Sequence, residues 1–183
     1  MNRNPSPGAR RAGEGTGDEQ RRVPVVTAIA NRGGYVLLMS HTHTWVLVHC
    51  VFSTQGRLDL IPDVTEICKY LTGIAHSKNI TLLAAGGTAN HIHLLVAQPP
   101  TVTLAKVMQD LKGNSSRWLN KRGTKFAWQE GFGGFSVSQS QKQVVADYIA
   151  HQAEHHRRWT FEQEFMTLLK KSGAKIDKER VFG

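Results

Sequence analysis

Residues 80–97, with the sequence ITLLAAGGTANHIHLLVA, decide the fold. Two apolar runs, at 80–85 and 91–97, flank a Gly-rich segment at 86–90, which predicts two strands joined by a turn into a β-hairpin. Side chains alternate between the faces of a strand, so His91 and His93 share one face while Ile92 faces the core with Leu94 and Val96.

The segments on either side of this hairpin supply further elements. A buried strand is predicted at 44–53 and a helix at 62–78, which precede the hairpin. After it come a helix to residue 121, begun by Thr101 or Thr103, a strand at 135–138, a helix at 141–156 and a weaker helix at 160–171. The order β-α-β-β-α-β is typical of the ferredoxin-like fold. We therefore predict an α+β sandwich with an antiparallel sheet, helices on one face, and a C-terminal helix carrying Tyr148.

The composition indicates a globular, basic chain. Its 183 residues are 40% hydrophobic and carry a formal net charge of +9, which favours a polyanionic partner, most often a nucleic acid. No apolar run reaches the length of a membrane span, and no secretory signal is recognisable. Cys50 and Cys68 lack C-x-x-C spacing, so neither a zinc knuckle nor a disulfide framework is expected, and we predict a cytoplasmic protein with no membrane partner.

Composition also divides the chain into regions. Residues 1–38 are predicted to be a disordered basic extension, because their Arg-, Gly- and Pro-rich start cannot bury enough apolar surface. Met39 is an alternative start for the natural chain. Residues 39–171 form the predicted folded domain, and 172–183 a flexible C-terminal tail.

The pair His91 and His93 is a candidate metal site. Two imidazoles about 7 Å apart along a strand can converge on one cation, although a third ligand must come from elsewhere. The alternative is a pair of surface histidines on a half-exposed strand. Tyr148 and Gln152, at i and i+4, lie about 6 Å apart along one face of the last long helix, with His155 and His156 following. Tyr148 could equally be an ordinary amphipathic residue that covers the sheet.

A basic face is predicted on the helix that ends at residue 121. Lys106, Arg117 and Lys121 lie opposite its apolar stripe, and six Lys or Arg residues stand between positions 106 and 125 against Asp110 alone. Such a face binds phosphates or is simply solvated. Trp128 is a candidate for stacking on unpaired bases, or a core residue.

Five short segments together resemble one known family: 48–54, NHIHLLV at 90–96, LKGNSS at 111–116, WQEGF at 128–132, and Tyr148-x-x-x-Gln152. Their order and spacing are similar to those of the small single-tyrosine HUH transposases of bacterial insertion sequences and their repeat-associated relatives. The resemblance covers roughly residues 40–171.

This resemblance implies a homodimer that binds single-stranded DNA, often as hairpin ends, with Tyr148 as the nucleophile that forms a 5′-phosphotyrosine. It also implies that His91, His93 and Gln152 hold Mg²⁺ or Mn²⁺, with His155 or His156 as a substitute or supplement for Gln152. Tyr148 and Gln152 are expected to act either within one chain or across the dimer. The expected DNA-binding residues are Lys106, Lys112, Arg117, Lys121, Arg122 and Trp128.

Three alternatives stay open at this point. A domesticated relative would nick repeat-associated hairpins without moving an element. A ferredoxin-like sheet can also bind RNA or single-stranded DNA without catalysis, although no RNP-type aromatic pattern is present. A structural two-histidine metal protein would leave Tyr148 and the basic face unexplained.

Overall fold

The computed structural model describes residues 44–173, so the predictions for 1–38 and for the tail beyond 173 lie outside the described residues. The strands are β1 (Leu47–Ser53), β2 (Thr81–Thr88), β3 (His91–Ala97) and β4 (Gly133–Val137). The α-helices are α1 (Val64–Ser77), α2 (Leu104–Lys121), α3 (Lys142–Ala150), α4 (Gln152–His155) and α5 (Phe161–Lys171), and 3₁₀ turns cover η1 (Gln55–Arg57) and η2 (Gln139–Gln141).

The four strands form one antiparallel sheet in the order β2-β3-β1-β4. Strand β3 lies between β1 and β2, which are parallel to each other, so this is the split βαβ arrangement predicted from the sequence. The register pairs Phe52 with Ile92 and Ser53 with His91. The two histidines therefore lie on an interior strand, paired on both sides.

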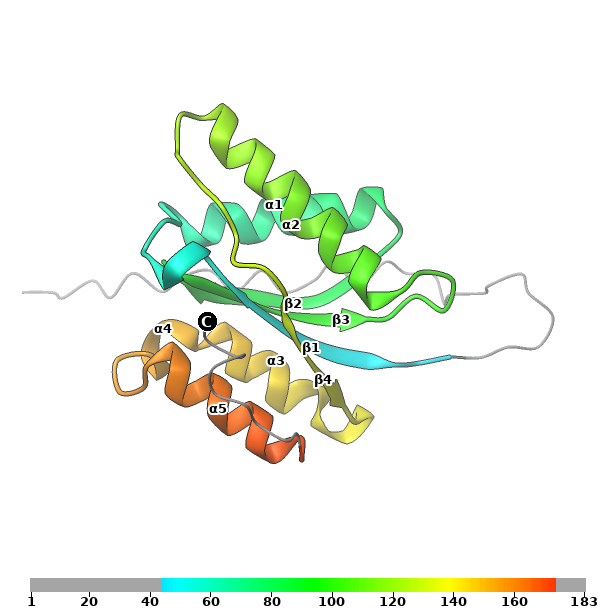
Figure 1. Cartoon of the computed structure of the whole chain (residues 1–183). Helices are drawn as coiled ribbons and strands as arrows, with labels where there is room; N and C mark the ends of the chain where they lie inside the picture. Colours follow the sequence, from blue (N-terminus) through cyan, green and yellow to red (C-terminus); the bar gives the residue numbers. More distant parts are fainter. Residues whose placement is uncertain (1–43, 174–183) are drawn as a thin grey trace, which may run out of the picture.

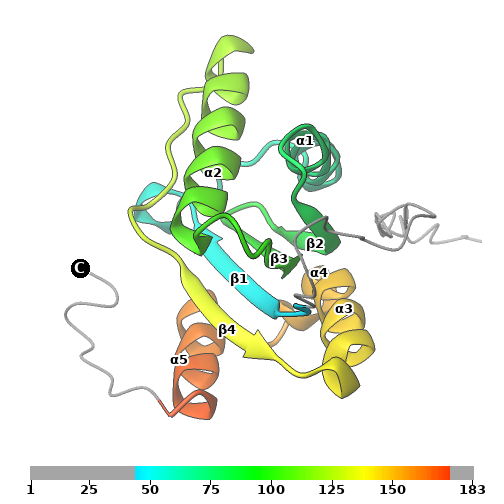
Figure 2. The same cartoon turned by 90° about the vertical axis from the view of Figure 1, so that its right-hand side faces the viewer.

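Helices cover both faces of the sheet (Figure 1). Helices α1 and α2 lie on one face, over the larger apolar core, which includes Ile92, Leu94 and Val96 as predicted. Helices α3, α4 and α5 lie on the other face, where Leu47, Ala84, Leu95 and Ile149 form a second, smaller core. Figure 2, seen at right angles, shows the same two layers and places α3 and α5 beneath the sheet.

Side-chain caps fix where three helices begin. The Asp63 carboxylate accepts a hydrogen bond from the Glu66 amide at 3.0 Å, and Thr103 accepts one from the Lys106 amide at 3.2 Å. Thr103, rather than Thr101, therefore begins α2. Thr160 forms a full capping box with Gln163 at the start of α5. These caps satisfy amide groups that a helix leaves without partners at its first turn.

Two predicted elements differ in the structure. Gly86 and Gly87 belong to β2, and only Ala89 and Asn90 make the turn. The glycines are needed there because a Cβ at Gly86 would overlap the carbonyl oxygen of Ile149 in α3. The predicted helix at 141–156 is also interrupted, since His151 leaves helical geometry (φ −104°, ψ 22°) and separates α3 from α4. Within residues 44–173, no helix combines the length and apolarity that crossing a membrane requires.

Candidate active site

The two strand histidines lie on one face, as predicted, but that face is buried rather than half-exposed. The exposed fraction is 1% for His91 and 0% for His93. Phe161 of α5 covers His91, with 4.9 Å between ring centroids, and Tyr148 of α3 lies edge-on to His93 at 6.1 Å. The C-terminal helices thus convert an exposed strand face into an enclosed site.

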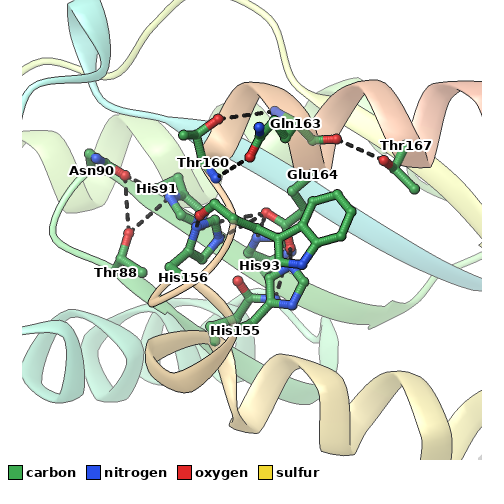
Figure 3. A network of polar contacts seen from close by, with 12 residues as sticks. Thr88, Asn90, His91, His93, His155, His156, Thr160, Gln163, Glu164 and Thr167 are labelled. Atoms are coloured by element: carbon green, nitrogen blue, oxygen red, sulfur yellow. Dashed lines mark hydrogen bonds and ion pairs between the residues drawn. The ribbon is translucent and has the colours of Figure 1, made fainter.

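Hydrogen bonds orient both rings in the same way. Nδ1 of His91 lies 2.7 Å from Asn90 Oδ1 and 2.9 Å from Thr88 Oγ1, and Nδ1 of His93 lies 2.9 Å from His49 Nε2 (Figure 3 labels all of these except His49). The carboxamide oxygen of Asn90 can only accept, so the proton of His91 belongs on Nδ1. With the same tautomer at His93, both Nε2 atoms carry free lone pairs that face the interior of the site.

The imidazole of His91 is held in the neutral form that binds cations. Burial, followed by the neighbouring His93, lowers the pKa of His91 to about 3. Burial and His93 likewise lower the pKa of His49 to about 3. His49 is itself buried in β1 and orients the His93 ring through the contact between His49 Nε2 and His93 Nδ1. The sequence did not reveal this role.

Tyr148 lies next to the histidines of its own chain. Its hydroxyl donates a hydrogen bond to the Glu164 carboxylate and lies 3.4 Å from His155 Nε2. Burial, with the adjacent Glu164 carboxylate, raises the pKa of the Tyr148 phenol above its usual value. The phenol is therefore protonated here, and nearby positive charge would be needed to make it a better nucleophile.

Glu164 of α5 stands at the centre of the site and was missed by the sequence analysis. Its side chain is 2% exposed, and its Oε2 lies 3.0 Å from His156 Nε2 and 3.3 Å from His93 Nε2. Burial opposes ionisation, but the hydrogen bond with His156, together with the neighbouring imidazole of His93, holds the pKa of Glu164 well below its usual range. The group is an anion enclosed by imidazoles.

The signal for Glu164 was present in the amphipathic pattern of α5. Phe161 contacts His91, Phe165 contacts Phe135, and Leu168 lines the groove beside Tyr148. These residues lie at i, i+4 and i+7 on one face of α5, and Glu164 at i+3 occupies the same stripe. A carboxylate on an apolar stripe needs buried partners, since an unpaired buried charge is very unfavourable.

The donor set at this site suits a divalent cation. Ligand atoms of His91, His93, His156 and Glu164 all lie within 4.8 Å of one another. The buried Nε2 atoms of His91 and His93 and the Oε1 of Gln152 have no hydrogen-bond partner. Three buried acceptors left without donors, beside one carboxylate, are what a cation would satisfy. The predicted ligands His91, His93 and Gln152 are thus brought together, and His156 joins them.

A groove leads to the tyrosine from outside. A cavity of about 760 Å³ lies between β4, α3 and α5, and its lining includes Tyr148, His155, Trp159, Glu164 and Lys171. Trp159 is 46% exposed at its edge. Tyr148 is therefore approachable from this side, whereas His91 and His93 are sealed.

The predicted DNA-binding residues do not surround this site. Lys106, Arg117 and Lys121 are exposed on α2, and α2 lies across the sheet from α3, the helix that carries Tyr148 (Figure 1). Lys106 pairs with Asp110 at 2.9 Å, and Arg122 pairs with Glu66. The basic face exists as predicted, but it is separated from the tyrosine by the sheet.

Two of the predicted DNA-binding residues are used in packing. The Lys112 ammonium donates to the carbonyl of Gln129 at 2.7 Å and also to that of Gly131, which fastens the loop before β4. Trp128 lies edge-on to Phe52, at 4.7 Å between centroids, and its indole N–H donates to Ser115 Oγ at 3.0 Å. Their placement gives them a structural role, so we leave both out of the DNA-binding surface proposed below.

A ferredoxin-like domain with paired strand histidines facing a helix tyrosine has the architecture of a transposase domain. Transposases are enzymes that cleave DNA and transfer strands. The chain belongs to the family described as "Transposase IS200 like", which matches residues 42–152.

Individual relatives agree with this assignment. Over 130 residues the chain is 28% identical to the transposase for insertion sequence element IS200 of Salmonella typhimurium and of Salmonella typhi, covering 65% of this chain and 84% of each relative. Its fold also matches the structure of a REP-associated tyrosine transposase bound to a REP hairpin, with a TM-score of 0.50 and 13% identity over 67% of this chain and 76% of that one.

Proposed function

We propose that this transposase binds single-stranded DNA ends and cleaves and rejoins them through a covalent bond to Tyr148, with a divalent cation at His91 and His93. The observation that carries the proposal is the juxtaposition of the Tyr148 phenol with two buried imidazoles whose Nε2 atoms have no hydrogen-bond donor. A structural tyrosine would need no such acceptors beside it.

The reaction conserves bond energy. Tyr148 Oη bonds to the scissile phosphorus, the phenolic proton leaves, and the bond from phosphorus to the 3′ oxygen breaks. That oxygen takes up a proton, which leaves a 5′-phosphotyrosine and a free 3′-OH. A second 3′-OH can reverse the reaction on the same phosphorus and join new strands without ATP. Attack by water would give hydrolysis instead.

His91, His93 and Gln152 are the proposed ligands of Mg²⁺ or Mn²⁺. A bound cation would supply positive charge to the phosphoryl oxygens and to the developing phenolate. The orphaned Gln152 Oε1 supports its place in this set. Around the cation, the chain's own contribution is to orient the imidazoles, through Asn90 and Thr88 at His91 and through His49 at His93.

The DNA is proposed to contact both faces of the domain. The groove beside Tyr148 has room for an unpaired strand, and the exposed basic face of α2 is suited to phosphates of a paired stem. The REP-associated relative is bound to a REP hairpin, and we extend hairpin recognition to this chain. We place this DNA recombination in the cytoplasm, a reducing compartment that suits the free thiols of Cys50 and Cys68.

The test is covalent trapping. End-labelled single-stranded DNA from the sequence flanking the gene is incubated with Mg²⁺ or Mn²⁺ and run on a denaturing gel, using wild type, Tyr148→Phe and His91→Ala. We expect a protein–DNA adduct only with wild type and metal. Adduct formation by Tyr148→Phe would assign the nucleophile elsewhere. Intact DNA binding without any adduct would favour a non-catalytic binding module.

Mixing variants tests whether a homodimer shares its sites. In this chain Tyr148 lies beside its own His93, with ring centroids 6.1 Å apart, which supports a site completed within one chain. If sites are instead composite, Tyr148→Phe mixed with His91→Ala would restore adduct formation, because one site of the mixed dimer is intact. We expect no restoration.

A further inference from the structure

The helix α5 lies beyond residues 42–152, the segment that matches the family, and it inserts one carboxylate into the site. Glu164 is the only acidic residue among the potential metal-ligating groups clustered there in the described part of the chain. The two oxygens of this carboxylate face different partners, so one oxygen can bind a cation while the other accepts hydrogen bonds.

One oxygen faces the imidazoles. Glu164 Oε2 lies 3.0 Å from His156 Nε2, 3.3 Å from His93 Nε2 and 3.8 Å from His91 Nε2. Ligand atoms that each stand about 2.0–2.1 Å from one ion are separated by about 2.8–3.4 Å when they are adjacent in octahedral or tetrahedral geometry, and by about 4.0–4.2 Å when they are opposite in an octahedron. The separations from His156 and His93 lie in the adjacent range, and the separation from His91 lies between the adjacent and opposite values. Since all four ligand atoms lie within 4.8 Å of one another, a small movement would bring them onto one cation.

The other oxygen faces the nucleophile and His155, whose Nε2 lies 3.6 Å from Glu164 Oε1. Glu164 Oε1 accepts hydrogen bonds from the Tyr148 hydroxyl and from Gln152 Nε2, the latter at 3.1 Å. A carboxylate can bind a cation through one oxygen and accept hydrogen bonds through the other. Glu164 is placed to do both.

We propose that Glu164 Oε2 and His156 Nε2 are ligands of the same divalent cation as His91 and His93, while Glu164 Oε1 holds the Tyr148 hydroxyl beside that cation. This inference rests on the metal site in the proposed function and adds an anionic ligand to it. Three imidazoles with one carboxylate favour Mn²⁺, Co²⁺ or Zn²⁺ over Mg²⁺, which prefers oxygen ligands.

The competing explanation is a structural ion pair between Glu164 and a protonated His156. Such a pair needs no metal, and the orphaned Nε2 atoms of His91 and His93 would then be unexplained. The two explanations predict opposite effects of removing the carboxylate. An ion pair would leave metal affinity unchanged or improved, because His156 would be freed, whereas a ligand role would weaken it.

The experiment measures Mn²⁺ binding to the full chain without DNA, by following the electron paramagnetic resonance signal of free Mn²⁺. Wild type is compared with Glu164→Gln and His156→Ala. Glu162→Gln is the matched control, because Glu162 is on the same helix but 45% exposed and paired with Arg57 at 2.8 Å. We expect one ion per chain and a loss of affinity of at least about tenfold in both site variants, with none in the control.

Folding is checked by circular dichroism for each variant. If Glu164→Gln does not fold, His156→Ala decides the question, since its side chain is less buried and equally assigned as a ligand. Wild-type affinity in a folded Glu164→Gln or His156→Ala protein would overturn the proposal.

The adduct assay distinguishes this inference from the proposed function. Tyr148→Phe should bind Mn²⁺ like wild type, because the phenol is not a ligand. Metal-dependent adducts together with unaltered Mn²⁺ binding by Glu164→Gln would remove Glu164 from the metal site and keep the transposase mechanism. If Mn²⁺ binding depends on Glu164 but no adduct forms, Glu164 stays a metal ligand and the proposed transposase mechanism is refuted.

Discussion

Gly86→Ala is expected to displace the nucleophile without touching any residue of the site. Gly86 lies in β2 directly beneath the end of α3, and an added Cβ would overlap the carbonyl oxygen of Ile149 and lie 3.1 Å from its carbonyl carbon. Ordinary contact between such atoms is about 3.5 Å. Backbone atoms cannot rotate away, so α3 would have to move by about 1 Å, and Tyr148 is the residue before Ile149.

Two magnitudes follow from this displacement. Overpacking of this kind costs about 1–3 kcal/mol of unfolding free energy. A shift of about 1 Å in a reacting group lowers rates about a hundredfold. The first is measured by urea unfolding followed by circular dichroism, and the second by the initial rate of Tyr148–DNA adduct formation.

Gly73→Ala is the matched control for Gly86→Ala. Gly73 lies in the exposed face of α1, where an added Cβ meets nothing within 4 Å. The same substitution there should stabilise the protein by about 0.5–1 kcal/mol, because alanine is the better helix former, and should leave the adduct rate unchanged. Equal stability and equal rates for the two variants would refute the claim that β2 and α3 need this close approach.

Three further predictions concern the core, the histidine pair and the basic face. Burial raises the pKa of the Cys50 and Cys68 thiols to about 12, so at pH 8 both stay protonated and should react with a thiol reagent about a thousandfold more slowly in the native protein than in denaturant. His49→Ala removes the partner of His93 Nδ1 and should weaken Mn²⁺ binding about 10–100-fold in the resonance titration; unchanged affinity would contradict the supporting role. Replacing the exposed basic residues of α2 with alanine should reduce the slope of log affinity for DNA against log salt by about 2–3, measured by fluorescence anisotropy with Tyr148→Phe as the unaltered reference.

The sequence predicted the fold because its strands and helices repeat apolar residues at two clear periods. The strand at 91–97 keeps Ile92, Leu94 and Val96 in the larger core, and the caps at Asp63 and Thr103 mark helix starts in the ordinary way. The order β-α-β-β-α-β predicted the ferredoxin-like class, which the structure confirms. These features depend on neighbours in the chain, which a sequence displays directly.

The hairpin and the last long helix were predicted less well, because contacts between distant segments decide them. Gly86 and Gly87 resemble a turn locally, and only the passage of α3 over β2 shows that they make room for a backbone. The interruption at His151 likewise leaves no strong sequence signal, since no glycine or proline marks it. It matters because it separates Tyr148 on α3 from Gln152 on α4.

The site itself was half predictable, and the missing half has a physical signature. His91 and His93 were found by alternation along a strand, and their Nε2 atoms are buried without hydrogen-bond partners. Glu164 is an anion on an apolar stripe, and burying it without compensating charge would cost several kcal/mol. Buried imidazole acceptors and a buried carboxylate are each unfavourable without a compensating charge or donor, so finding one in a domain indicates that the other lies nearby. A carboxylate at a core position of a helix that follows a His-x-His strand is therefore a candidate metal ligand. Glu164 lies beyond residues 42–152, the segment that matches the family, so a motif search over that segment could not have found it.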